Sequence, residues 1–171
     1  MNINIECKSE FDGWDVDFDW VKNSAKSMLE YLLAQTEIKN KCCLKDYNYD
    51  TISFDFLFTN SGQTHWINLE YRSKNHPADI ITFAVFADCD DNERFVIDGD
   101  INLGEIIIAL DKMIEGGLEK GINKEDELAF FMSHGIMHLL GFDHNTISDY
   151  NFVVEWQKKA LESININYDK I

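Results

Sequence analysis

Three histidines within eleven residues form the part of this sequence best suited to chemistry. His134 and His138 are four residues apart, so on an α-helix their imidazoles lie on one face and can bind one ion. Gly141 is placed to end that helix in the left-handed conformation, which would return His144 toward the other two rings. Three neutral imidazoles without a nearby cysteine suit zinc or a similar metal and leave one coordination position for water. The spacing therefore predicts a catalytic metal site.

The same histidine spacing occurs in metzincin proteases, where a glutamate after the first histidine serves as general base. In this chain Gly135 occupies that position, so protease chemistry loses its base. The other two histidines, His65 and His76, are isolated in the sequence. We interpret both as ordinary hydrogen-bonded residues.

The elements that must position these histidines follow from apolar periodicity. Strands are expected near residues 2–8, 51–58, 80–86 and 103–110, and helices near 18–36, 63–71, 123–139 and 147–163. The first strand is expected at or near a sheet edge. The pattern predicts an α+β fold, with a small mixed sheet of about four strands packed against several helices and the metal site on a helix and its following loop.

Three local expectations are more specific. The almost continuous apolar run 80–86 predicts a strand that is buried on both faces. In the weakly helical segment 63–71, Trp66, Leu69 and Tyr71 are expected on the buried side. A short helix beginning at Asp111 is expected to break at Gly116-Gly117.

Length and composition favour one globular domain over residues 1–171. The sequence shows no signal-peptide pattern and no apolar run long enough to span a bilayer, so we expect a cytoplasmic protein without a membrane partner. The four scattered cysteines are expected to be free thiols. The net charge of −16 opposes non-specific binding to nucleic acid, and the acidic segment 88–93 is interpreted as a solvated loop.

Several blocks together resemble the YbeY family of bacterial endoribonucleases. Residues 134–144 match the family pattern HGxLHLxGYDH, residues 68–72 match NxxYR, residues 77–83 match PTDVLSF, and residues 103–106 match LGDI. The blocks run in the family's order, whereas the N-terminal third agrees only in its strand-helix-strand pattern. Met137 stands where leucine is usual, Phe142 where tyrosine is usual and Ala78 where threonine is typical, and the last change removes a hydroxyl able to hold a loop or substrate.

The resemblance implies a metal-dependent, single-strand-specific endoribonuclease that acts in ribosomal RNA maturation, at the 3′ end of the small-subunit rRNA, and in ribosome quality control. It implies zinc, or another divalent ion, on His134, His138 and His144, and the family's arginine falls on Arg72, facing phosphate. Asp143 is a candidate either to orient an imidazole or to accept a proton, with a simple turn residue as the equal alternative. The implied partners are ribosomal RNA or the ribosome, together with ribosomal or assembly-factor proteins.

Two alternatives remain open from the sequence. One is a metal-dependent hydrolase of a peptide or small ester, and the other is a non-catalytic ribosome assembly factor with a structural metal. An RNA-binding role for so acidic a chain requires a local basic groove, which we expect to combine Arg72, Lys74 and the lysines around residue 41 beside the histidines.

Overall fold

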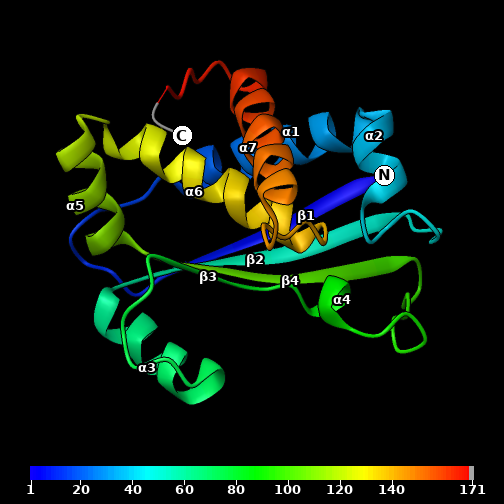
Figure 1. Cartoon of the computed structure of the whole chain (residues 1–171), viewed down its shortest axis with the longest axis horizontal. Helices are drawn as coiled ribbons and strands as arrows, with labels where there is room; N and C mark the ends of the chain where they lie inside the picture. The colour runs from blue at the N-terminus through cyan, green and yellow to red at the C-terminus, as the bar shows by residue number, and fades with distance from the viewer. Residues whose placement is uncertain (170–171) are drawn as a thin grey trace.

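The centre of the protein is a four-stranded mixed sheet with the strand order β1-β2-β4-β3, seen in a computed structural model that describes residues 1–169 (Figure 1). β1, β2 and β4 run parallel, and β3 pairs antiparallel with β4. β1 lies at one edge, as its alternating sequence predicts. The strand bounds are β1 Asn2–Ser9, β2 Thr51–Thr59, β3 Ile80–Phe83 and β4 Asp100–Ala109.

Long helices cover one face of this sheet, and the other face carries a separate helix (Figure 1). The covering helices include α1, α6 and α7, which contact one another, while α3 lies below the sheet. The helix bounds are α1 Phe18–Ala34, α2 Thr36–Lys41, α3 Ser61–Arg72, α4 Val85–Asp88, α5 Leu110–Lys120, α6 Lys124–Leu139 and α7 Ile147–Ser163. The α+β architecture expected from the sequence is confirmed.

The main core lies between the sheet and the covering helices. In β2 the alternate side chains Ile52, Phe54, Phe56 and Phe58 are almost completely buried, because successive side chains of a strand point to opposite faces. The helices α6 and α7 add their apolar stripes to the same cluster. Burial of this continuous apolar surface stabilises the scaffold that carries the histidines.

The strand expected over residues 80–86 is too long, and the expectation that both faces are buried is wrong. The strand ends at Phe83, and α4 begins at Val85. β3 is an edge strand in which Ile81 is the buried residue, while its neighbours are only partly covered. The chain turns away after Phe83 so that Phe86, on the short α4, can enter the core.

The helix expected over residues 63–71 exists, but its buried face was assigned wrongly. Thr64, Ile67 and Asn68 are the buried residues of α3. Trp66 and Leu69 are each 52% exposed, and Tyr71 is 65% exposed. On the sheet face that α3 covers, Ile81 and Ile107 form only a small apolar area against Ile67 of the helix. The helix therefore buries a narrow stripe and leaves its aromatic residues exposed.

The expected break at Gly116-Gly117 is also wrong, because α5 continues to Lys120 and ends at Gly121, which has φ 71°. A Cβ atom on Gly117 would lie 3.2 Å from the Ile122 carbonyl oxygen and 3.3 Å from Cγ of Glu127. The missing side chain therefore lets the start of α6 approach α5 closely, and this packing outweighs the low helix propensity of glycine.

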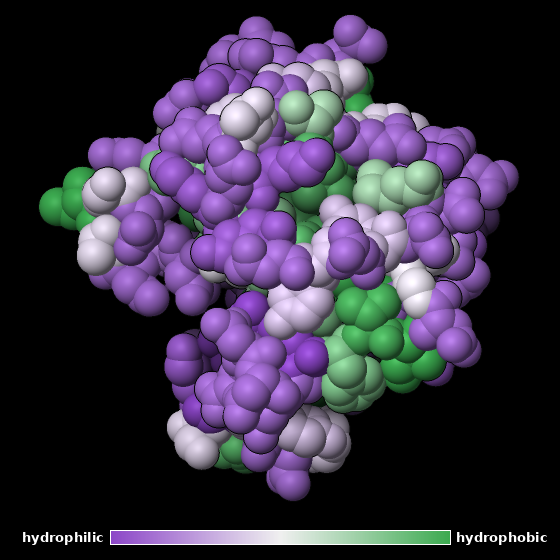
Figure 2. Space-filling view, turned by 90° about the vertical axis from the view of Figure 1, so that its right-hand side faces the viewer, coloured by the Kyte–Doolittle hydropathy of each residue, from purple (hydrophilic) through white to green (hydrophobic). Residues whose placement is uncertain are grey.

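The surface is largely hydrophilic, as expected from the net charge of −16. Figure 2 shows this for the side that carries α2 and the loop after α4, where hydrophobic side chains form only limited patches. The four cysteines are free thiols, as expected. Within residues 1–169, the helices are all too short or too polar to cross a membrane.

Candidate metal centre

Helix α6 positions the first two histidines on one of its sides. The helix starts after Asn123, whose side chain accepts a hydrogen bond of 2.8 Å from the backbone N–H of Asp126. Midway along, an added Cβ on Gly135 would lie 2.7–2.9 Å from three side-chain carbons of Ile106 on β4. Glycine thus allows α6 to lie directly on the sheet, and His134 and His138 occupy the adjoining side of the helix.

A Schellman turn brings the third histidine to the first two. Gly141 has φ 92°, its N–H donates to the His138 carbonyl oxygen at 2.9 Å, and the Phe142 N–H donates to the Met137 carbonyl oxygen at 3.0 Å. The ring centroid of His144 lies 5.5 Å from that of His134 and 5.1 Å from that of His138. The left-handed glycine expected from the sequence is confirmed, and it reverses the chain as required.

The three imidazoles fit the donor set of a borderline divalent metal. One nitrogen from each ring lies within 4.8 Å of the others, and the Nε2 atoms of His134 and His138 are 2.9 Å apart. Burial and the neighbouring His138 lower the pKa of His134 to about 4, and burial and His144 lower the pKa of His138. The two helical ligands are therefore neutral at pH 7, the form in which imidazole binds a metal.

Asp143 lies beside this cluster and contacts one of its rings. Its Oδ1 atom is 3.3 Å from Nδ1 of His138. A proton held on Nδ1 by this carboxylate leaves the Nε2 lone pair of His138 directed toward His134 and available to an ion. The geometry favours an orienting role for Asp143 over that of a simple turn residue.

The histidines open into a cleft of about 680 Å³ that also contains Arg72 and Lys74. Arg72 Nη1 donates a hydrogen bond of 3.1 Å to Oδ1 of Asn68, and Asn68 Nδ2 donates to the His76 carbonyl oxygen at 2.9 Å. Asn68 is completely buried. It therefore couples the guanidinium to the loop that leads into β3.

Asp88, at the end of α4, adds a second carboxylate to the cleft. Burial and the nearby Asp143 raise the pKa of Asp88, whereas His138 opposes this shift. Residues 88–93 are all exposed, as expected for a solvated loop, and the first of them also lines the cleft of the candidate metal ligands. Sequence reasoning missed this residue because an acidic run without ligand spacing carries no signal for a cleft.

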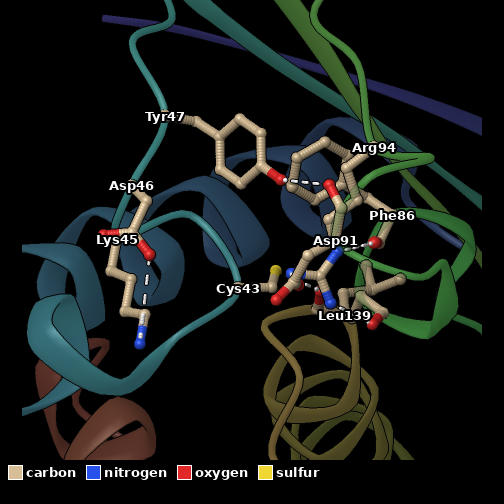
Figure 3. Close-up of polar contacts among 9 residues, drawn as sticks. Cys43, Lys45, Asp46, Tyr47, Phe86, Asp91, Arg94 and Leu139 are labelled. Carbon is tan, nitrogen blue, oxygen red and sulfur yellow. Dashed lines mark hydrogen bonds and ion pairs between the residues drawn. The ribbon is translucent and has the colours of Figure 1, made fainter.

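Arg94 holds the short helix α4 and the loop that follows it. Its guanidinium donates to the carbonyl oxygens of Phe86 at 2.7 Å and Ala87 at 2.5 Å, and it pairs with Asp91 at 2.7 Å (Figure 3). On the α6 side, Cys43 Sγ lies 3.5 Å from the Leu139 carbonyl oxygen. These contacts anchor α4 and the C-terminal end of α6, the helix that carries His138.

The expected basic groove is only partly present. Arg72 and Lys74 line the histidine cleft, but Lys41 and Lys45 line a separate pocket of about 470 Å³ with Arg94. Lys41 pairs with Glu37 at 2.8 Å, and Lys45 lies 4.0 Å from Asp46. The lysines around residue 41 are therefore not beside the histidines. Helix α4 and the C-terminal end of α6 lie between the two pockets.

Two other sequence observations have structural answers. The loop at Ala78 is held by Thr64, whose Oγ1 donates to the Ala78 carbonyl oxygen at 2.7 Å. His65 contacts Asn75 at 2.8 Å and His76 contacts the Pro77 carbonyl oxygen at 3.0 Å. Both isolated histidines are thus hydrogen-bonded residues, as interpreted. No role was assigned to Asn68 or Thr64 from the sequence, because the pattern of a short helix does not show which of its polar residues are buried.

Comparisons with known proteins show the family of this chain. An endoribonuclease YbeY from Agathobacter rectalis is 32% identical over 123 residues, covering 66% of this chain and 74% of the relative. One from Bacillus cereus is 28% identical over 150 residues, covering 86% and 96%, and one from Syntrophomonas wolfei is 30% identical over 101 residues, covering 58% and 65%. The sequence profile of the family described as endoribonuclease YbeY matches residues 5–165. The chain therefore belongs to the endoribonuclease YbeY family.

Proposed function

We propose that this protein is a metal-dependent endoribonuclease that cleaves single-stranded RNA. The observation that carries the proposal is the placement of three imidazole donors and the Arg72 guanidinium in one cleft, in a chain of this family. His134, His138 and His144 would hold the ion, with zinc the best match to an all-imidazole set. When bound, the ion would supply Lewis-acid polarisation of a phosphoryl oxygen and acidification of water.

The protein's own residues supply the phosphate-binding half of the site. Arg72 hydrogen bonds to the neutral amide of Asn68, which leaves the positive charge of the guanidinium available to a substrate. A guanidinium can bind a phosphodiester through two parallel hydrogen bonds and stabilise negative charge that develops during cleavage. Asp143 would keep the His138 ring in its ligand orientation throughout.

The cleft supports a nuclease over a peptide or ester hydrolase. A metzincin-type glutamate would have to occupy position 135, where even a Cβ would lie 2.7 Å from Ile106. The basic residues Arg72 and Lys74 line the same cleft as the histidines and suit a phosphodiester substrate. The cluster in the described part of the chain contains three ligand residues, which leaves a position for water and supports a catalytic over a structural metal.

The proposed substrate is ribosomal RNA, with cleavage at the 3′ end of the small-subunit rRNA and a role in ribosome quality control in the cytoplasm. This finer assignment rests on membership of the family. Binding to the ribosome or to its protein components would also bring so acidic a chain, with its net charge of −16, close to RNA.

The decisive experiment combines elemental analysis with cleavage assays on single-stranded RNA, duplex RNA and a peptide. We expect His138→Ala to lose both the bound metal and RNA cleavage, and Arg72→Ala to retain the metal but lose cleavage. His65→Ala is the matched control, since His65 contacts Asn75 away from the cluster. Full cleavage by His138→Ala, or cleavage of the peptide alone by the wild type, would refute the proposal.

A further inference from the structure

A second pocket continues from the metal cleft on the other side of His134. It has a volume of about 310 Å³ and lies between α5, α6 and the start of β3. His134 and Ile80 line both this pocket and the cleft. In Figure 1 the three elements meet at the end of the sheet where α5 lies. We call this space the α5–α6 pocket, and its position makes it the next subsite for a chain bound across the metal ligands.

The walls of the α5–α6 pocket suit a planar ring. Ile80, Phe130 and Phe131 contribute apolar surface, and Phe130 is only partly buried. The Phe130 ring is held in place by a stacked Tyr168 ring, with centroids 4.5 Å apart and an interplanar angle of 10°. Unstacked bases of single-stranded RNA bind to aromatic side chains of this kind, and about 300 Å³ lies at the lower end of small-ligand sites.

The charged residues of the pocket are largely fixed by one another. Glu127 is 1% exposed, and its carboxylate accepts hydrogen bonds from Lys120 at 2.6 Å and from the Tyr168 hydroxyl at 2.7 Å. Lys112 lies 3.8 Å from Glu115 in an exposed pair, which contributes little stability. Lys112 and Asp79 therefore remain at the rim as a donor and an acceptor for the polar edge of a base.

We propose that the α5–α6 pocket binds one nucleobase of the RNA, next to the scissile phosphate. The inference rests on the proposed endoribonuclease function and adds a subsite to it. The phosphate would lie at Arg72 and the histidines, and the adjacent base would pass His134 and Ile80 to contact Phe130. The pocket thereby fixes the position of the strand and the identity of the nucleotide beside the cut.

Gly116 allows a direct test because it lines the pocket and a Cβ added to it meets no atom within 4 Å. Gly116→Trp would fill the pocket, whereas Gly116→Ala adds only a methyl group. Glu119→Trp adds the same ring to an exposed position of α5 outside the pocket. Thermal melting and zinc content of each purified variant would show that the fold and the metal site are retained.

The assay uses single-stranded RNA oligonucleotides in which each nucleotide near the cleavage site is replaced in turn by an abasic one. Stacking of one base is worth roughly 1–3 kcal/mol, so for the wild type one abasic position should lower kcat/KM about 5- to 150-fold. On intact RNA, Gly116→Trp should lower kcat/KM by a similar factor relative to the wild type. On the RNA with that abasic position, the substitution should lower kcat/KM little further. Glu119→Trp should behave as the wild type, because Glu119 lies outside the pocket.

The outcomes separate this inference from the function on which it rests. If the wild type cleaves RNA but no abasic position matters, or Gly116→Trp cleaves intact RNA as the wild type does, the base subsite is wrong and the nuclease stands. If the wild type with its metal cleaves no RNA, the proposed function is wrong and the subsite falls with it.

Discussion

Replacing Gly135 by alanine should destabilise the protein, although alanine is the better helix former. The new Cβ would lie 2.7, 2.8 and 2.9 Å from three carbons of Ile106, including atoms close to its own backbone. Real Cβ atoms do not approach this closely, so α6 or the Ile106 side chain must move. Overpacking of a core by one carbon costs about 1–3 kcal/mol.

Gly116→Ala provides the reference for this prediction. Gly116 also lies within a helix, α5, and its Cβ would meet nothing within 4 Å. The Gly116→Ala substitution should raise the free energy of unfolding by about 0.5–1 kcal/mol, because alanine lowers the entropy of the unfolded chain. The difference between the two substitutions removes the shared propensity effect and isolates the packing cost at Gly135, about 1–3 kcal/mol.

Urea unfolding with a chelator present measures this difference without a contribution from bound metal. For a chain of this size, 1 kcal/mol corresponds to a shift of roughly 2–4 °C in Tm. A second substitution, Ile106→Val, removes one of the contacted carbons and should recover part of the loss in the Gly135→Ala protein. Equal stability of Gly135→Ala and Gly116→Ala would refute the close packing of α6 on β4.

The remaining predictions concern the metal site and its supports. Asp143→Asn should retain the fold but bind zinc roughly 10- to 100-fold more weakly, measured by competition with a chromophoric chelator; unchanged affinity would exclude an orienting role. Gly104→Ala should severely lower Tm, because Gly104 has φ 128° and its Cβ would collide with the Phe83 carbonyl oxygen; a normal melting curve would contradict this. The metal-free protein should lose stability as the pH falls from about 6.5 toward 4, because the unfolded chain protonates His134 in a range where the folded chain, with a pKa of about 4, does not. Urea titrations across this range test the slope, which His134→Gln should reduce.

The histidine cluster was predictable because its constraints are local. The spacing of His134 and His138 depends only on helix geometry, and the return of His144 depends on one glycine in the left-handed region. The sheet and long helices were predictable for the same reason, since period-2 and period-3.6 patterns report one buried face. Residues 147–163 form α7 with the bounds that the sequence predicts.

The errors arose where distant parts of the chain decide the outcome. Whether α3 buries Trp66 or Ile67 depends on how little apolar surface β3 and β4 offer beneath the sheet. Likewise, α5 passes through Gly117 because Glu127 and Ile122 require a close approach there. The positions of Asp88 and of Lys41 relative to the histidines depend on how α4 packs against α6, which no local pattern encodes.

The arrangement of α6 explains how a protease-like histidine spacing can accompany a different chemistry. In this helix the residue after the first histidine faces the sheet, and contact with Ile106 limits it to glycine. A general base therefore cannot come from the helix itself. Within the described residues, the carboxylates that line the cleft are Asp88, on α4, and Asp143, in the loop beside the histidines. Close packing against the sheet thus gives the imidazoles a rigid support, and an acid or base from the protein would come from outside α6.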